Sequence, residues 1–452
     1  MPKSFRLGLL RDPDFGRLFA ATAVGQLGDR ILFLALPLVA IVALNADELQ
    51  VGLLTATTTA GSLLVGLPAG AWVDRMRKRS VMIATDLVRA LVLLTIPMAW
   101  WAGLLTIRWL YAVALVHGVL TVFFDVAYVS FLPHLVGRDN LVEGNAKLSA
   151  VRSVTSISGP ALAGPLVGWA GAPATLLAGS AGMALSGALA IGIRARERGP
   201  EPGVCPRWGR DVKEGLKFVL KHPVLRATIM GDATFNLFLI MYQTMLLVHL
   251  KREMGLGPFG TGLVLSGMGC GALLGALLAS RASKRIGQGP VIWIAPLVTC
   301  PPTALMAWAR PGWSLGAAAL GLAALSLGGV VRVVAQSSFQ QALTPDRLLG
   351  RMSATARFVS WGGIPLGGVL GGVSGSAFGA PATLWIGAVG MTASFLPNFL
   401  SPLRTMRTVP EAEDPEGAGG RAGSAASRPR PDSPRPGAVR RSDAQGASRR
   451  DA

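Results

Sequence analysis

The chain has 452 residues, of which 51% are hydrophobic and only 15% are charged, against roughly 25% charged residues in a typical soluble domain. A chain of this length would otherwise form two or three soluble domains, but it has too few polar residues to cover their surfaces. Composition therefore excludes an ordinary soluble enzyme and predicts an integral membrane protein whose surroundings are a lipid bilayer.

Apolar stretches of about 20 residues, the length that crosses a bilayer as a helix, recur along the whole chain. The first six lie near 17–44, 50–73, 80–102, 108–132, 148–170 and 173–194. After a polar segment, six more lie near 224–250, 258–280, 289–309, 312–336, 351–376 and 380–401. The pattern predicts an all-α polytopic membrane protein of 12 transmembrane helices, with both termini on one side of the membrane.

The distribution of Lys and Arg predicts which side that is. One set of loops, which includes the N-terminus, carries 23 basic residues, whereas the opposite set carries only Arg108, Lys251, Arg252 and Arg310. Because Lys and Arg are concentrated in cytoplasmic loops, we expect cytoplasmic termini and a location in the plasma membrane, the inner membrane of a bacterium. The same asymmetry accounts for most of the net charge of +19 without nucleic acid as a partner.

Two segments outside the predicted spans differ in composition from the rest. The central segment alternates apolar residues with Lys213, Lys217 and Lys221, a pattern typical of an interfacial amphipathic helix or of a solvated linker helix. The end of the chain is rich in Pro, Gly, Ser, Ala and Arg and has no periodicity, which predicts disorder. The expected organisation is a six-helix bundle over 1–195, a cytoplasmic linker over 196–223, a second six-helix bundle over 224–402 and a disordered cytoplasmic tail over 403–452.

The two predicted bundles share an internal repeat. The sequence GAPATL over 171–176 recurs over 379–384, each time at the start of the last span of its half, and Arg152 corresponds to Arg357 upstream. Duplication of six spans is the construction of many transporters, whose substrate site lies between the halves near the bilayer midplane. A non-transporting scaffold with the same number of spans remains the alternative.

The connection between the second and third spans contains a recognisable motif. It reads GAWVDRMRKR over residues 70–79 and resembles the loop signature Gly-x-x-x-Asp-Arg-x-Gly-Arg-Arg of the major facilitator superfamily, with Arg77 in place of the second Gly. In the fold that this resemblance implies, the loop lies beside Asp125 near the cytoplasmic end of the fourth span. Ion pairs between them would hold the cytoplasmic side closed, as a gate formed by Gly70, Asp74, Arg75, Arg79 and Asp125.

The fifth span contains a second motif of the same superfamily. Gly159, Pro160 and Gly164 resemble the Gly-Pro-x-x-Gly-Gly core of the antiporter motif found in its proton-coupled exporters. Close helix packing at a Pro kink is the alternative interpretation of these residues.

Further segments resemble the branch of the superfamily that includes macrolide-efflux proteins and the enterobactin exporter. They include QLGDR over 26–30 and DLVR over 86–89, and the resemblance covers roughly residues 12–402. It implies the major facilitator fold and alternating access driven by an ion gradient, usually of protons, with export of amphipathic compounds.

Charged residues inside predicted spans are functional candidates, because a charge at the centre of a bilayer costs about 2.5–3.5 kcal/mol even on the more lenient scale. The predicted proton or substrate groups are Asp29, Arg30, Asn236, Gln243 and His117. Asp29 is either a proton or substrate group or part of a structural ion pair, and His117 either titrates or only packs. Asp86 and Arg89, one helical turn apart, are expected to form a structural ion pair.

These observations predict a secondary transporter rather than an enzyme. The His and Cys residues lack the spacing of metal ligands, and no phosphate-binding Gly loop is present, so we expect no metal, no cofactor and no use of ATP. The leading hypothesis is a monomeric, proton-coupled exporter of drug-like or siderophore-like small molecules. An importer or a lipid mover of the same fold, and a membrane receptor or scaffold, are the alternatives.

Overall fold

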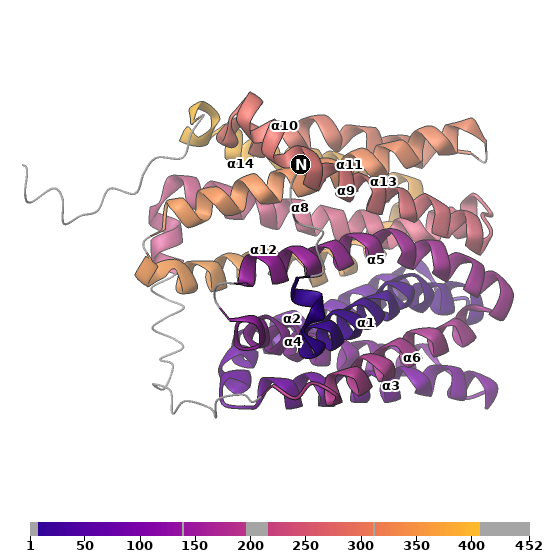
Figure 1. Cartoon of the computed structure of the whole chain (residues 1–452). Helices are drawn as coiled ribbons and strands as arrows, with labels where there is room; N and C mark the ends of the chain where they lie inside the picture. Colours follow the sequence, from indigo (N-terminus) through magenta and orange to yellow (C-terminus); the bar gives the residue numbers. More distant parts are fainter. Residues whose placement is uncertain (1–7, 138–139, 196–215, 311, 345, 407–452) are drawn as a thin grey trace, which may run out of the picture. The chain divides into compact units, whose positions relative to one another are not determined.

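The computed structural model describes residues 8–137, 140–195, 216–310, 312–344 and 346–406, and the regular structure in these ranges is helical (Figure 1). The first group of long helices comprises α1 (Pro13–Leu38), α2 (Glu48–Asp74), α3 (Lys78–Trp101), α4 (Ile107–Val136), α5 (Leu141–Ala170) and α6 (Ala172–Ile191). The second group comprises α8 (Pro223–Val248), α9 (Pro258–Ile286), α10 (Gln288–Thr299), α11 (Trp313–Ala342), α12 (Asp346–Phe378) and α13 (Ala380–Ala393). Shorter elements are η1 (Leu9–Arg11), η2 (Val39–Ala43), η3 (His249–Glu253), η4 (Pro301–Trp308), α14 (Phe395–Phe399) and η5 (Pro402–Thr405).

The internal repeat in the sequence is also a repeat in local structure. Gly171 and Gly379 have φ angles of 82° and 81°, a left-handed conformation that favours glycine. In both copies a Pro follows within the first turn of the next helix, α6 or α13, where its missing N–H leaves no donor unsatisfied. The same six residues therefore end one helix and begin the next in each half.

Nine stretches of the described residues are helices long and apolar enough to cross a membrane. Each of them overlaps a span expected from the sequence, which confirms the helical architecture for the described residues and supports a multi-pass membrane protein. Three predicted spans fall on helices outside this set. Of these, α5 carries Glu143, Lys147 and Arg152, α12 carries Arg357, and α13 has only 14 residues.

Several helices are longer than the expected spans, because their first or last turns carry polar residues that lie outside the apolar stretch. The largest such difference is at α5, which begins at Leu141 rather than near residue 148. Residues 216–221 of the expected linker helix are helical. The remainder of that linker from residue 196, and the tail from residue 407, lie outside the described residues.

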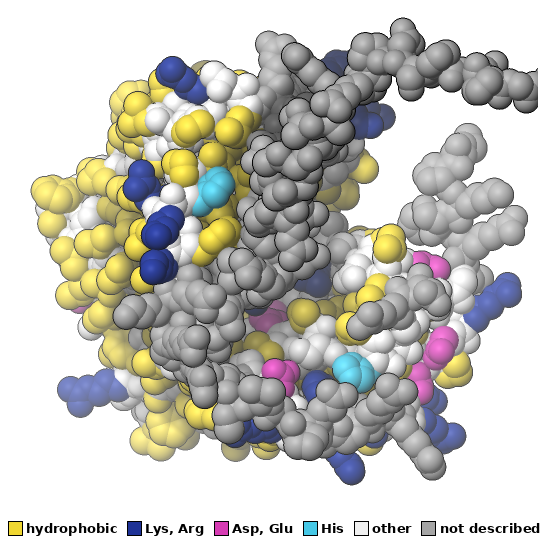
Figure 2. All heavy atoms as spheres, turned by 90° about the vertical axis from the view of Figure 1, so that its left-hand side faces the viewer, with side chains coloured by type: hydrophobic (Ala, Val, Ile, Leu, Met, Phe, Trp, Pro, Cys, Tyr) yellow, Lys and Arg dark blue, Asp and Glu magenta, His cyan; other side chains and the backbone are white. Residues whose placement is uncertain are grey.

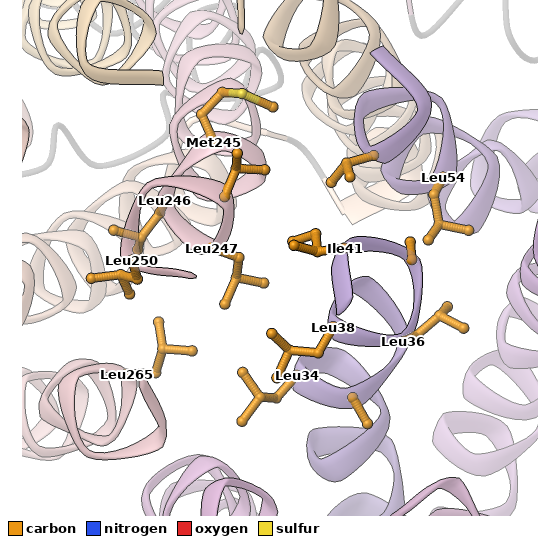
Figure 3. Packing of buried hydrophobic residues seen from close by; sticks show 14 of the residues in the cluster. Leu34, Leu36, Leu38, Ile41, Leu54, Met245, Leu246, Leu247, Leu250 and Leu265 are labelled. Atoms are coloured by element: carbon orange, nitrogen blue, oxygen red, sulfur yellow. The ribbon is translucent and has the colours of Figure 1, made fainter. Parts of the chain in front are cut away.

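The two groups of helices meet mainly at one end of the described structure. We call the end that holds the α1–α2 connection (residues 44–47) the far end, and the end that holds the α2–α3 connection (residues 75–77) the near end. One cluster of buried apolar side chains combines both groups toward the far end, with Leu34, Leu38 and Ile41 facing Leu247 of α8 and its neighbours (Figure 3). At the near end, by contrast, separate clusters occupy the first group and the second group.

Close backbone contact and an ion pair add to this far-end closure. A side chain at Gly52 of α2 would meet the Gly372 backbone of α12 at 2.5 Å, so the two helices touch directly. Arg252 Nη1 lies 2.7 Å from Glu48 Oε1 across the two groups, and the same guanidinium donates to the Ala46 carbonyl oxygen. At the near end the described surface is hollowed between the groups, and we call this recess the near-end hollow (Figure 2).

The Glu48–Arg252 ion pair is expected to favour the far-end-closed conformation. Glu48→Gln removes its charge, and a partly exposed pair contributes about 0.2–1 kcal/mol. The population with the far end open should therefore rise by up to about fivefold, measured as longer distances between spin labels at the far ends of α2 and α9.

Lys251→Gln is the matched control, because Lys251 makes no ion pair within the described residues. An unchanged distance distribution in Glu48→Gln would show that apolar packing alone closes the far end.

Candidate functional site

A buried charged cluster joins four helices of the first group. Arg89 of α3 lies at its centre and pairs through Nη2 with Asp86, one turn earlier on the same helix. Both side chains are only 1% exposed. Ser186 of α6 donates a 2.7 Å hydrogen bond to the other oxygen of the Asp86 carboxylate. The Asp86 carboxylate is therefore fixed between α3 and α6.

Asp29 of α1 is the member of this cluster that solvent can reach. Its Oδ1 atom lies 3.6 Å from Arg89 Nη1 and 3.7 Å from His117 Nε2 of α4. The Asp29 side chain is 34% exposed, whereas that of His117 is 8% exposed. Asp29 thus connects two buried basic side chains to accessible space.

The Arg89 guanidinium is held on its remaining sides by α4. Its Nη1 donates to Thr121 Oγ1 at 3.3 Å, and Thr121 in turn donates to the His117 carbonyl oxygen at 2.8 Å. The guanidinium also lies 4.5 Å from the centre of the Phe124 ring, a cation–π arrangement. These contacts fix the position of Arg89 between the two carboxylates.

Within ion-pair distance of one another the cluster holds two carboxylates and one permanent cation, and Arg30 of α1 lies near enough to Asp29 to interact with it electrostatically. With Asp29 and Asp86 both ionised and His117 neutral, the two carboxylates share a single arginine as ion-pair partner. Uncompensated charge is costly where water is largely excluded. A single additional proton, on the Asp29 carboxyl or on the His117 ring, balances the charges within ion-pair distance. The arrangement is therefore chemically able to bind and release one proton.

The antiporter-like motif of α5 contacts this region and also the second group. A side chain at Gly159 would collide with the Arg30 side chain of α1, so the glycine makes room for that arginine. A side chain at Gly164 would come within 3.3 Å of the Gly262 backbone of α9, and one at Gly262 would meet the Pro160 carbonyl oxygen. The motif thus lies in the close contact between α5 and α9.

Other residues singled out in the sequence lie apart from the cluster in this conformation. Asn236 and Gln243 of α8 are partly buried, and within the described part of the chain no hydrogen bond links either of them to Asp29. Asp74, Arg75 and Asp125 are exposed and, among the described residues, form no ion pair with one another.

Arg79 and Gly70, the remaining gate residues, have contacts within the first group. Arg79 donates to the backbone oxygens of Ala190 and Ile191 at the end of α6, and Gly70 is partly buried within α2. The expected contact between the α2–α3 connection and Asp125 is thus not made while the far end is closed.

Sequence reasoning missed a second charged cluster, in the other group of helices. Arg332 of α11 lies 2.8 Å from Asp232 of α8, donates to Gln336 Oε1 at 3.0 Å and covers the Phe235 ring at 4.4 Å. Here one acid balances one base. The available signal was that Asp232 and Arg332 are opposite charges in spans of the same half.

Nowhere in the described ranges do three or more His, Cys, Asp or Glu side chains form a group able to hold a metal.

Comparison with known sequences gives a match over nearly the whole chain. Residues 6–416 match the family described as transmembrane secretion effector, of the major facilitator superfamily. The chain is 26% identical to the multidrug efflux pump Tap of Mycolicibacterium fortuitum, over 86% of this chain and 96% of the relative. It is 23% identical to the enterobactin exporter EntS of Escherichia coli, over 77% of this chain and 82% of the relative.

Solved structures of transporters share the fold. A mutant of the nucleoside transporter NupG superposes with a TM-score of 0.72 at 12% identity, covering 85% of this chain and 98% of that one. A bacterial homologue of the iron transporter ferroportin in an inward-facing state gives a TM-score of 0.69 at 15% identity, over 86% and 98% of the two chains. At these identities the likeness concerns the fold alone.

The charge count predicts unequal effects of removing the two partners in the Asp86–Arg89 pair. Arg89→Met leaves the buried Asp86 and the partly exposed Asp29 without their shared cation and should cost about 3–5 kcal/mol of stability. Asp86→Asn should cost less, because Asp29 can still balance Arg89. The measurement is the apparent melting temperature of the purified protein, with exposed Arg108→Gln as the control. Equal losses from the two substitutions would contradict this account of Arg89.

Proposed function

The chain belongs to the transmembrane secretion effector family of the major facilitator superfamily, and from this premise we propose that it is a proton-coupled exporter of drug-like or siderophore-like small molecules. It is a multi-pass membrane transporter and not an enzyme. Export as the direction of transport is supported by the relatives Tap and EntS, which are named as an efflux pump and an exporter.

The observation that carries the proposal is the shared cation of the Asp29 cluster. Asp29 is accessible and lies within 3.6 Å of an arginine that already pairs with Asp86. When Asp29 is ionised it competes with Asp86 for Arg89, and when it is protonated Asp86 holds Arg89 alone. Proton binding at Asp29 thus changes the contacts between α1 and α3. Such a difference between two protonation states allows a proton gradient to drive alternating access.

The described conformation corresponds, in this proposal, to the state that opens to the cytoplasm. The near end is the cytoplasmic end, and the far end is closed by the shared apolar cluster and the Glu48–Arg252 pair. In the opposite state the α2–α3 connection, with Asp74, Arg75 and Arg79, closes the near end against neighbouring helices and Asp125. In this proposed cycle Asp74 has no partner across the near end while the transporter is open to the cytoplasm. The exposed position of Asp74 in this structure agrees with that state.

The proposed arrangement in the membrane has twelve spans, both termini in the cytoplasm and a monomeric chain in the plasma membrane. Nine helices qualify by length and hydropathy among the described residues. The other three, α5, α12 and α13, are less apolar or shorter, and pack against the rest. In α5 and α12 the charges lie toward the helix start or between the two halves, where lipid does not surround them.

Thiol labelling in intact cells tests this topology. A single Cys introduced at Asn45 or Gly255 should react with a membrane-impermeant reagent from outside the cell. A Cys at Arg77 should react only after the membrane is opened, because the basic loops are expected in the cytoplasm. A Cys at Arg77 that reacts in intact cells would reverse the proposed orientation.

Asp29→Asn tests proton coupling, because it mimics the permanently protonated carboxyl. It should abolish uncoupler-sensitive efflux of dyes and antibiotics against a gradient, while substrate binding survives in part. The measurement pairs accumulation by cells lacking their own pumps with proton release from everted vesicles on substrate addition.

Asp232→Asn is the matched control, since Asp232 is also an acid paired with a buried arginine but has a cation of its own. If the Asp29→Asn protein still concentrates substrate, Asp29 is structural, and coupling has to be sought at His117 or Asp86.

A further inference from the structure

Two arginines related by the internal repeat lie at similar depths on opposite halves of the molecule. Arg152 follows the first residue of α5, Leu141, by eleven positions, and Arg357 follows the first residue of α12, Asp346, by eleven positions. At 1.5 Å per residue both lie about 16 Å along their helices from the near end. Both side chains are exposed.

Among the residues that the structure describes, neither arginine forms an ion pair with an acid. Their recorded contacts are with aromatic rings: Arg152 lies 5.9 Å from the centre of the Tyr128 ring and Arg357 lies 5.3 Å from that of Trp361. An arginine stacked on a ring keeps the edge of its guanidinium free for hydrogen bonds. They thus differ from Arg89 and Arg332, whose charges are balanced by buried or half-buried carboxylates.

Asp125 of α4 shows that the two arginines face the space between the halves. It stands eleven residues before the last residue of α4, Val136, and therefore at a depth similar to that of the arginines. Both Arg152 and Arg357 are close enough to interact with it electrostatically. Since one arginine belongs to each half, the three side chains converge between the halves and not on the outer, lipid-facing surface.

We propose that Arg152 and Arg357 together bind an anionic group of the transported molecule, such as a carboxylate, sulfonate, phosphate or ionised phenol. The inference rests on the proposed export function and specifies the substrate class. The two guanidinium groups, one on each half of the molecule, present paired N–H donors that match the oxygens of such anionic groups. In the empty site Asp125 partly balances the two positive charges from a distance. A bound anionic group of the substrate lies closer to the guanidinium groups and balances their charge instead.

The position of this site also links it to closure of the near end. One arginine is carried by α5 of the first group and the other by α12 of the second group. An anion that contacts both guanidinium groups draws these two helices together on the near side. Binding would therefore favour the conformation that closes to the cytoplasm, as export requires.

Two dyes of the same ring system and opposite charge test the proposal. Fluorescein is anionic and tetramethylrhodamine methyl ester is cationic, and their binding to the full-length protein in phosphatidylcholine nanodiscs is followed by fluorescence anisotropy. Fluorescein should bind. Arg152→Gln and Arg357→Gln should each weaken it by about tenfold or more, as expected from losing a charge-assisted hydrogen bond. Binding of the cationic dye should stay the same or tighten.

Charge-preserving and distant variants complete the comparison. Arg152→Lys and Arg357→Lys should lose less affinity than the Gln variants, and Arg108→Gln, at the far end of α4, should lose none. The proposal is overturned if the wild-type protein fails to bind fluorescein, or if the Gln variants bind it as tightly as the wild type. Proton-driven dye export by everted vesicles is measured separately, and its absence counts against the export function and not against the anion site.

Discussion

The Arg89 guanidinium is the only permanent cation that touches two carboxylates in the described cluster, and the first half of the molecule is arranged around it. Through Asp86, which accepts a hydrogen bond from Ser186, the guanidinium is linked to α6. It contacts Thr121 and Phe124 of α4, and it lies within ion-pair distance of Asp29 of α1. Burying a charge is tolerated only where partners surround it. Separating these four helices would deprive the buried Arg89 of its partners, so this charge holds the helices of the first half together.

The two halves of the molecule use charge differently although they share an internal repeat. In the first half two acids compete for one arginine, and one of the acids is accessible. In the second half Asp232 and Arg332 balance each other one to one, with Gln336 and Phe235 completing the contacts. In the proposed mechanism the proton therefore binds in the first half, where two acids share one arginine, and not at the balanced pair of the second half.

Closure of the far end rests on surfaces that can separate without breaking covalent or buried polar structure. Gly52 and Gly372 bring α2 and α12 into backbone contact, Gly164 and Gly262 do the same for α5 and α9, and Glu48 and Arg252 form a partly exposed ion pair. Dispersion between close backbones is lost steeply with small displacements. Such an interface is either closed or open, which is the behaviour that the proposed alternating access requires, and the antiporter-like motif of α5 is part of it.

The sequence by itself determined the helices and the local pairs. Hydropathy located the long apolar helices, the GAPATL repeat marked the same helix junction twice, and Asp86 with Arg89 could be read as a pair because residues three apart share one helix face. Only the tertiary structure decided that Asp29 meets Arg89 and His117, that Arg332 meets Asp232, and that the far end is the closed one. Contacts between distant helices depend on how far each helix is rotated and shifted against its neighbours. These rotations and shifts follow from the fit of whole helix surfaces against one another, which the order of residues within a single helix does not specify.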